Sequence, residues 1–445
     1  MDTPIRDFIT EYSLKGSLRL HMPGHKGENL TGLERFDITE IDGADSLYSA
    51  SSIIRKSEEN ASSLFGAHTF YSTEGSSLVI RAMLYLALKH AKERQVEPLI
   101  LAGRNAHKSF ISACALLDIN VEWIYGSDNS YLSCSLTADT VKEKLSSLSI
   151  KPVAVYITSP DYLGNMVDLK SIAEFCKNND LLLLVDNAHG AYTKFLNSSI
   201  HPIDLGATAC ADSAHKTLPT LTGGAYLHVS NDAPSGFISQ AKNALSLFGS
   251  TSPSYLILQS LDVVNAYISD GYKEKLNHYI KKIETLKERL KIAGYTLVGN
   301  EPLKITINAK KYGYYGHELY SVLSSENITP EFYDSDYVVL MLTIEIGDRL
   351  DNLESVLLSI QKKSEILERP PILHALKRAI TPREALLSPT EIISVNDAVG
   401  RVLADITVSC PPAVPIATCG EIIDENTVKL FNYYGIKTCV VVKKI

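Results

Sequence analysis

Short continuous apolar segments alternate with segments of helical periodicity between about residues 60 and 230. In chain order, the strand-like and helix-like segments lie at 98–103, 108–118, 151–160, 168–180 and 181–190. Strands that are apolar on both faces and separated by helices are typical of a parallel sheet covered on both sides. We therefore predict an α/β domain here, with functional residues at the carboxyl ends of its strands.

The rest of the pattern divides the chain into four parts. Residues 1–50 have few periodic apolar positions and are expected to form an irregular arm, followed by the large domain over 51–270. A long amphipathic helix opens the third part, 271–368, which is expected to be a smaller α/β domain. The proline-containing break LERPPIL at 367–373 precedes the last part, 369–445, which is expected to form a C-terminal α+β domain.

Composition and charge are those of an ordinary globular protein. The 445 residues suggest two or three domains. A net charge of −8 without any Lys/Arg block argues against a nucleic acid or an anionic membrane as partner. No run approaches the ~20 apolar residues of a membrane-spanning helix, and no signal peptide is evident. We therefore expect a cytoplasmic protein.

No metal site is expected. His21 and His25 are separated by Pro23 and Gly24, so they lack the helical i,i+4 geometry of zinc ligands. The seven cysteines are scattered without a CxxC pair, which indicates buried free thiols in a reducing compartment. They are Cys114, Cys134, Cys176, Cys210, Cys410, Cys419 and Cys439.

A single lysine, Lys216, stands among polar residues in the stretch CADSAHKTLPTLTGGAYLH, residues 210–228. A lysine amine can form a Schiff base with an aldehyde, and pyridoxal phosphate (PLP) is the commonest aldehyde cofactor used this way. PLP also needs a carboxylate facing its pyridine nitrogen and a flat group against its ring. Its phosphate needs N–H donors, best supplied by a glycine-containing loop at a helix N-terminus.

The sequence offers a candidate for each of these needs. Asp186 ends a strand 30 residues before Lys216, and His107 follows the strand at 98–103. Ala188 and His189 lie just beyond Asp186, near the other ring face. The loop that opens the helix after residue 72 supplies the phosphate candidates Thr73, Gly75, Ser76 and Ser77.

Each candidate alone has a plainer interpretation. An aspartate after a strand is more often a cap or an ion-pair partner, and a helix-opening GSS is more often a simple N-cap. A lysine is by default a solvated surface residue. The order of phosphate loop, histidine, aspartate and lysine before a Gly-Gly break favours the PLP site.

Six stretches together resemble the bacterial ornithine/lysine/arginine decarboxylases, which are PLP enzymes of the aspartate-aminotransferase-like fold (fold type I). The stretches are HMPGHKG, HTFYSTEGSS, RNAHKS, DNAHGAY, DSAHKTLPTLTGGA and STSPSY. The resemblance runs from about residue 4 to about residue 440. It implies a large domain with a mainly parallel sheet, a smaller α/β domain and a C-terminal α+β domain. The chain starts about twenty residues before HMPGHKG, as in a short form without the receiver-like N-terminal domain.

The resemblance also implies roles for single residues. Lys216 would hold PLP as the internal aldimine, Asp186 would pair with the pyridinium nitrogen, and His107 would stack on the ring. Lys216 or His215 could return a proton to the substrate Cα after CO₂ leaves. The phosphate and the nearby polar edge would be surrounded by Thr73, Gly75, Ser76, Ser77, Ser213 and His215. Thr251 and Ser252 would reach the same phosphate from a neighbouring subunit, so the active site would need a homodimer.

The implied reaction is decarboxylation of arginine, lysine or ornithine to agmatine or a diamine, as in polyamine biosynthesis. Candidates for binding the distal cation of the substrate are Glu40, Asp45 and Glu421, although each could equally be a capping or surface carboxylate. The segments EIDGADSLY and CPPAVPIATCGE depart from the usual family pattern, which leaves the substrate open.

Two other functions stay open. One is another reaction of this PLP fold, such as aminotransfer or lyase chemistry. An aminotransferase would normally use an arginine of the small domain to bind the α-carboxylate, and Arg349, the arginine of residues 296–365, looks like a surface residue at a helix start. The other is a weakly active paralogue that keeps PLP for a regulatory or structural role.

Overall fold

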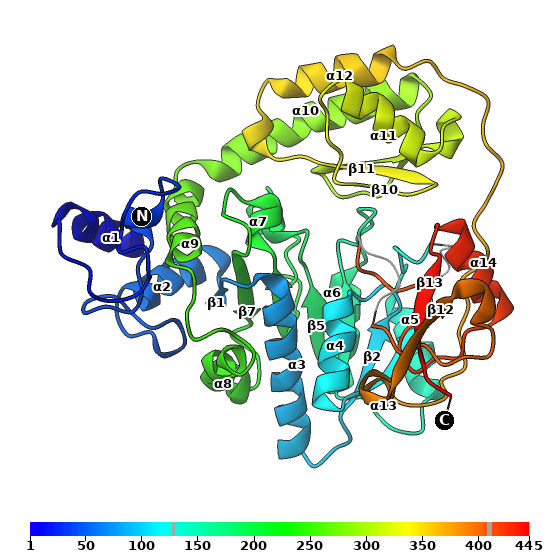
Figure 1. The fold of residues 1–445 in the computed structure, drawn as a ribbon, viewed down its shortest axis with the longest axis horizontal. Coiled ribbons are helices and arrows are strands. Elements are labelled where there is room, and N and C mark those ends of the chain that lie inside the picture. Colours follow the sequence, from blue (N-terminus) through cyan, green and yellow to red (C-terminus); the bar gives the residue numbers. More distant parts are fainter. Residues whose placement is uncertain (127–129, 407–411, 445) are drawn as a thin grey trace. The chain divides into compact units, whose positions relative to one another are not determined.

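The structure is a computed structural model that describes residues 1–126, 130–406 and 412–444. Its chain falls into two compact units, whose elements are labelled in Figure 1. The first unit comprises Met1–Glu97 and Cys176–Leu276, and the second comprises Pro98–Phe175 and Asn277–Ile445. The four-part division expected from the sequence stays a prediction.

The strands of the first unit lie in the order β1-β7-β6-β5. They are β1 (His68–Ser72), β5 (Leu182–Asp186), β6 (Ala209–Asp212) and β7 (Ala225–Val229). β5 and β6 are parallel, whereas β7 is antiparallel to both β6 and β1. The strands β1, β5 and β6 therefore end at one edge of the sheet, where β7 begins. That edge is where the polar segments identified in the sequence emerge.

The helices of the first unit pack against this sheet and against one another. They are α1 (Pro4–Leu14), α2 (Ile53–Phe65), α3 (Gly75–Glu93), α7 (Ala214–Thr217), α8 (Ser235–Ser246) and α9 (Tyr255–Ser269), with short 3₁₀ turns at 34–36, 47–49 and 191–195. α3 packs on β6, β7 and α8, while α2 packs on β1 and α9. These helices thus pack on the strands whose ends form the polar edge.

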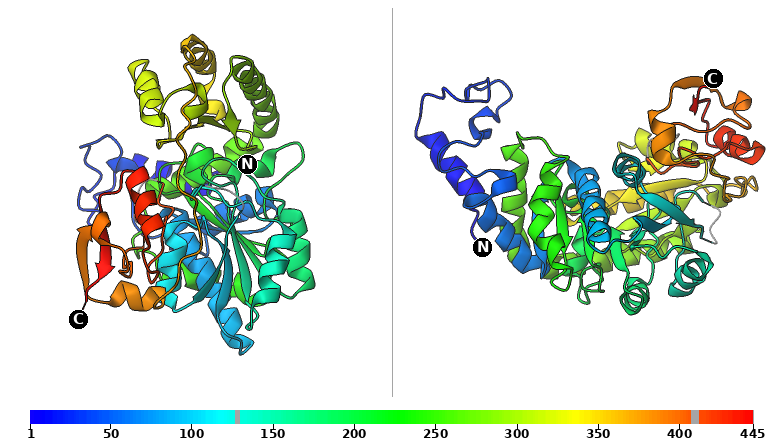
Figure 2. Two further views of the ribbon diagram at one scale, coloured as in Figure 1. Left: turned by 90° about the vertical axis from the view of Figure 1, so that its right-hand side faces the viewer. Right: turned by 90° about the horizontal axis from the view of Figure 1, so that it is seen from below.

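The expectation that residues 1–50 form an irregular arm is wrong for Pro4–Leu14, which is helical. This helix, α1, lies beside α2 and α9, as the dark-blue ribbon in Figure 2 shows. Ile5 and Ile9 are buried on one face, and Asp262 of α9 accepts hydrogen bonds from the N–H groups of Ile5 (2.9 Å) and Arg6 (3.0 Å). Long-range packing and this cap stabilise the helix, and neither is visible in the local sequence.

Asp262 gives this contact a pH dependence. Burial raises the pKa of Asp262 to about 6, against the lowering effect of its hydrogen bonds. A raised folded-state pKa means that the native state binds the proton more tightly than the unfolded chain does. The contribution of Asp262 to stability is therefore largest below about pH 4 and is lost as the pH rises through about 6.

We expect the free energy of unfolding of the wild type, relative to Asp262→Asn, to fall by up to about 3 kcal/mol between pH 4 and pH 7.5. Urea unfolding at several pH values measures this difference. Asp270→Asn, at an exposed position just after α9, is the control and should show no such trend. A difference for Asp262→Asn that does not change with pH would contradict the prediction.

The second unit contains three sets of strands. β4 (Ala154–Thr158), β2 (Leu99–Gly103) and β3 (Asn120–Ile124) lie in the order β4-β2-β3, and β2 is parallel to both neighbours. A four-stranded antiparallel sheet has the order β10-β11-β9-β8, from β8 (Leu297–Val298), β9 (Lys304–Asn308), β10 (Phe332–Tyr333) and β11 (Tyr337–Met341). β12 (Thr390–Ser394) pairs with β13 (Thr438–Val442).

The helices assigned wholly to the second unit are α4 (Lys108–Leu117), α5 (Ala138–Ser147), α11 (Gly316–Ser325), α12 (Arg349–Ser359), α13 (Pro382–Leu387) and α14 (Glu425–Tyr433). Its 3₁₀ turns lie at 310–312, 344–346 and 395–397. α6 (Leu169–Asn178) and α10 (Tyr272–Ile292) run from one unit into the other. A shared core that includes Phe332, Val339, Ile416 and Phe431 joins the small sheet to the C-terminal elements.

The expected fold class is confirmed: the chain is mixed α/β, its large-sheet strands are mainly parallel, and each strand and helix expected over residues 98–190 is present. The cysteines of the described chain are buried thiols, as expected, while Cys410 lies outside the described residues. Within the described residues, no helix is long and apolar enough to cross a membrane.

Candidate active site

The structure brings most of the predicted site residues into the first unit. This unit contains Glu40, Asp45, Thr73, Gly75, Ser76, Ser77, Asp186, Ala188, His189, Ser213, His215, Lys216, Thr251 and Ser252. The second unit contains His107 and Glu421. Three polar segments follow β1, β5 and β6 at the same sheet edge, which places the phosphate loop, Asp186 and Lys216 at that edge.

Lys216 lies on α7, the single helical turn that follows β6. Its Nζ is 3.0 Å from Nε2 of His189, which follows β5. The neighbouring His215 has its Nδ1 2.9 Å from the carbonyl oxygen of Gly224. Because a carbonyl can only accept, Nδ1 of His215 carries the proton. The lysine is therefore half-buried between polar partners rather than on a solvated helix face.

The phosphate loop is held against the Gly-Gly break. Gly75 has φ +71°, and its N–H donates to the carbonyl of Gly223 over 2.8 Å. A Cβ at Gly223, where φ is +101°, would lie 2.7 Å from the carbonyl oxygen of Thr73. Ser213 Oγ donates to Ser76 Oγ over 2.7 Å. Glycine is thus required at position 223 for two reasons: the backbone of Thr73 packs closely against it, and its own backbone is left-handed.

Asp186 is the last residue of β5 and is only 2% exposed. Its Oδ1 accepts a hydrogen bond of 3.2 Å from the N–H of Ala188. The next side chain, Asn187, donates through Nδ2 to Oδ1 of Asp212 over 2.7 Å. A buried carboxylate is thus present at the end of β5. The adjacent Asn187 links this strand end to Asp212 at the end of β6.

A buried network beneath this edge was not predicted from the sequence. Asp212 Oδ2 lies 3.0 Å from Nε2 of His201 and 3.3 Å from Nε2 of His228, and all three side chains are fully buried. Burial alone would raise the pKa of Asp212, but the two histidines lower it well below its usual range. His201, Cys210 and Asp212 place possible metal ligands within 4.8 Å. The hydrogen bonds of Asp212 to His201 and Asn187 already account for this geometry.

Three other predicted residues of the first unit, Thr251, Ser252 and Glu40, are exposed. Thr251 and Ser252 follow α8, and their loop is tied to α3 because the Ser250 N–H donates to Oε1 of Glu74 over 2.6 Å. Glu74, the N-cap residue of α3, had not been singled out in the sequence.

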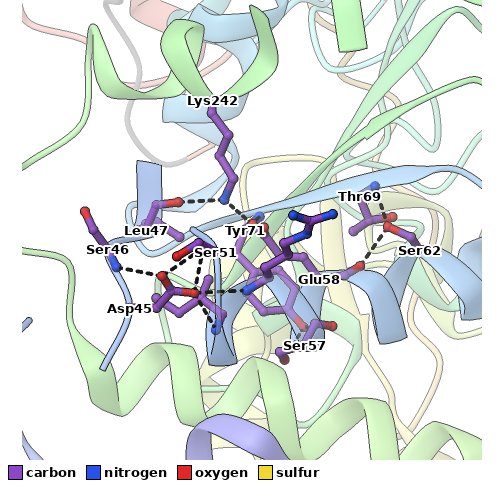
Figure 3. A network of polar contacts seen from close by, with 12 residues as sticks. Asp45, Ser46, Leu47, Ser51, Ser57, Glu58, Ser62, Thr69, Tyr71 and Lys242 are labelled. Atoms are coloured by element: carbon purple, nitrogen blue, oxygen red, sulfur yellow. Dashed lines mark hydrogen bonds and ion pairs between the residues drawn. The ribbon is translucent and has the colours of Figure 1, made fainter. Parts of the chain in front are cut away.

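Asp45 has a capping role, the alternative that the sequence left open. Its carboxylate accepts hydrogen bonds from the N–H groups of Ser46, Ser51, Ser52, Ile54 and Arg55, at the N-terminus of α2. Figure 3 shows this cap beside Lys242, which donates to the carbonyl of Leu47 over 2.6 Å. Asp45 is 5% exposed, so its oxygens are used in holding residues 45–55 together.

In the second unit, His107 is the N-cap of α4. Its Nδ1 accepts from the Ser109 N–H over 3.2 Å. Glu421 is 3% exposed and accepts from the Thr418 N–H over 2.7 Å. Arg349 is exposed at the start of α12, as expected, which leaves the aminotransferase alternative without its buried arginine at this position.

The residues of the first unit fit the requirements of PLP. The N-terminus of the 19-residue α3 offers backbone N–H groups and a favourable dipole next to the hydroxyls of Ser76 and Ser77. Ser213 adds a third hydroxyl in contact with Ser76. Asp186 supplies a buried carboxylate at the end of β5, and Lys216 supplies an amine from α7, which follows the parallel neighbour β6. This donor set suits a phosphorylated aldehyde with a basic ring nitrogen.

Comparisons with known proteins identify the family of the chain. Residues 3–301 match the family described as Orn/Lys/Arg decarboxylase, major domain. The uncharacterized protein YaaO of Bacillus subtilis is 29% identical, over 98% of this chain and 95% of its own. An arginine decarboxylase of Bacillus subtilis is 28% identical, over 96% and 92%.

A solved structure has the same fold. Lysine decarboxylase A from Pseudomonas aeruginosa aligns with a TM-score of 0.81 at 15% sequence identity, over 99% of this chain and 80% of that one. At this identity the likeness shows the fold alone, which is that of the fold-type-I PLP enzymes. The family match, in contrast, covers more than half of the chain. The chain therefore belongs to the Orn/Lys/Arg decarboxylase family and is a carboxy-lyase.

Proposed function

We propose that this enzyme decarboxylates a basic L-amino acid with PLP as its cofactor, releasing CO₂ and agmatine or a diamine. The observation that carries the proposal is Lys216, whose Nζ lies 3.0 Å from Nε2 of His189 at the edge where β5 and β6 end. Arginine is the first substrate to test, because several relatives are named arginine decarboxylase.

Each residue of the edge has a distinct task in this proposal. Lys216 would hold PLP covalently through Nζ, and Asp186 would keep a proton on the ring nitrogen. Ser76, Ser77 and Ser213 would bind the phosphate, together with Thr73. Gly75 would shape the loop, because its N–H donates to the carbonyl of Gly223. When bound, PLP supplies an electron sink for the electron pair that remains when CO₂ leaves.

The chain's own groups would manage the proton that replaces the carboxylate. Nζ of Lys216, once released by the substrate amine, can hold a proton and pass it to the substrate Cα. His189 supports this role because its Nε2 is within hydrogen-bond distance of that Nζ. His215 is a second candidate donor, since its ring is oriented by the bond from Nδ1 to Gly224.

The proposed active unit is a cytoplasmic homodimer. Thr251 and Ser252 are exposed in a loop that begins beside the N-terminus of α3, which supports a contribution of this loop to a shared phosphate site. His107 would contribute the ring-stacking group. Glu40, which is exposed, would be available to the distal cation of the substrate.

Incubation of the PLP-loaded enzyme with arginine, lysine or ornithine tests the proposal. We expect CO₂ release with one of them, arginine first, and a matching amount of the amine product by mass spectrometry. The enzyme without PLP is the control and should release none. Formation of a 2-oxo acid instead of CO₂ would contradict decarboxylation and indicate aminotransfer. No product from any of the three would contradict the proposed substrate class.

A further inference from the structure

The motif RNAHKS contains a buried arginine, Arg104, that the proposed chemistry does not use. Arg104 follows β2 and is 3% exposed. Its Nη1 donates to the carbonyl of Pro415 and its Nη2 to the carbonyl of Ile416, each over 2.9 Å. The guanidinium thus binds two consecutive carbonyls of a segment more than 300 residues away in sequence.

Two further contacts fix the guanidinium, and one fixes the backbone of Arg104. Its Cζ lies 5.3 Å from the ring centroid of Trp123 on β3, and its Nη2 lies 3.6 Å from Oε2 of Glu421. The backbone N–H of Arg104 donates to the carbonyl of Ile124 over 2.9 Å. The planar, two-pronged donor set suits two adjacent carbonyls, whereas a lysine ammonium lacks this geometry. Glu421 balances the buried positive charge.

The same C-terminal segment also contacts Lys108, the residue that follows His107 in the sequence. The N–H of Lys108 donates to the carbonyl of Ala413 over 2.9 Å. Ala413 has φ +62°, a left-handed conformation that a residue with a Cβ adopts at an energetic cost. Such a conformation persists when its surroundings enforce it. Residues 413–421 therefore bind the loop at Arg104 and at Lys108, on either side of His107.

We propose that Arg104 is a positioning residue that anchors residues 413–421 against the His107 loop and so fixes the orientation of His107. The importance of that orientation for PLP rests on the proposed function. In this arrangement Glu421 acts through Arg104 and does not contact the substrate. The C-terminal segment thereby becomes a structural support of the cofactor site.

A second arginine provides a matched control. Arg383 on α13 donates through Nη1 to the carbonyl of Leu116 over 2.9 Å, at the other end of α4 from His107. Both arginines therefore attach C-terminal elements near α4, but only Arg104 lies at the His107 end. Arg104→Lys and Arg383→Lys each keep the charge and remove the planar donor set.

The two variants are compared by melting temperature, PLP dissociation constant and hydrogen exchange of peptides along α4 in the cofactor-free protein. We expect Arg104→Lys to weaken PLP binding at least tenfold, to change the bound-cofactor spectrum, and to speed exchange around residues 105–110. Arg383→Lys should speed exchange around residues 115–120 and leave PLP binding within twofold of wild type. Equal PLP binding and equal exchange at 105–110 in both variants would overturn the proposal.

The design separates this proposal from the proposed function. If the wild type binds no PLP, the proposed function fails, but exchange at residues 105–110 still tests whether Arg104 holds the loop. If the wild type binds PLP and Arg104→Lys alters only the melting temperature, Arg104 is merely structural and the positioning proposal fails. Glu421→Gln should resemble a mild Arg104 variant. A changed KM with unchanged PLP binding would instead return Glu421 to the substrate pocket.

Discussion

Lys216→Ala is expected to abolish decarboxylation, with a loss of at least about 10³-fold in kcat, and to remove the absorption band of the bound cofactor at about 420 nm. The physical reason is that the covalent link to the aldehyde of PLP requires a side-chain amine, which alanine lacks. An alanine also removes the contact of Nζ with His189 and leaves no acid at that position for the substrate Cα. Absorbance of the PLP-incubated variant and CO₂ release measure the two effects.

Two further substitutions make this test specific. Lys216→Arg keeps the positive charge but cannot form the covalent link, so it should lose the band and the activity as well. Lys194→Ala removes another lysine of the same unit, whose Nζ is 2.6 Å from Asp204, and should keep both. A Lys216→Ala variant that retains the band and CO₂ release would show that another residue holds the cofactor.

Asp212→Asn is expected to have the largest effect on stability among single substitutions near the site. Removing one partner of a buried ionic group typically costs about 3–5 kcal/mol, and Asp212 faces His201, His228 and Asn187 with no exposure to solvent. An asparagine keeps the shape but offers only one acceptor oxygen and no charge. Because Asn187 follows Asp186 and Asp212 precedes Ser213, PLP affinity should fall as well.

The pH dependence of this effect has a definite sign. The pKa of Asp212 is lowered in the folded protein, so its stabilising contribution is present above the unfolded pKa of about 4 and is lost as the pH falls through the lower folded value. Burial also lowers the pKa of His228, so its protonation on acidification opposes folding. The stability advantage of the wild type over Asp212→Asn should therefore be full at pH 7 and shrink below about pH 4.

Urea unfolding of both proteins at pH 7 measures the cost. Asp204→Asn is a suitable control, because Asp204 forms a more exposed ion pair with Lys194 in the same unit, and such pairs are worth at most about 1 kcal/mol. A cost for Asp212→Asn no larger than that of Asp204→Asn would mean that the buried network contributes little to the fold.

The sequence predicted those parts of the fold that depend on local pattern. Continuous apolar strands such as 181–190 and the periodic helix at 108–118 have strong local signals, and both are present as β5 and α4. The helix Pro4–Leu14 was missed because its stability depends on Asp262 and on packing against α9, which the local sequence does not contain.

The site shows the same division between local and long-range information. The order of Asp186 and Lys216 in the sequence pointed to one sheet edge, since residues that follow neighbouring parallel strands meet there. The network of Asp212 was not predicted because it depends on pairing. His228 faces Cys210 across the β6–β7 ladder, which brings it near Asp212.

The carboxylates suggested for the substrate illustrate a further limit. Asp45 and Glu421 have the residue type that a cationic substrate needs, but residue type does not reveal what already occupies their oxygens. Asp45 caps α2 with backbone N–H groups, and Glu421 lies next to Arg104. Such partners depend on backbone direction and on contacts hundreds of residues apart, which only the folded chain specifies.

The central claim, that Lys216 holds the cofactor, is tested most directly by reducing the PLP-loaded wild type with borohydride and mapping the modified peptide by mass spectrometry. We expect a single phosphopyridoxyl group on Lys216, which a large excess of the preferred amino acid added before reduction should diminish. Label on a different lysine, or none after complete reduction of a PLP-saturated enzyme, would contradict the assignment of the active site to this edge of the sheet.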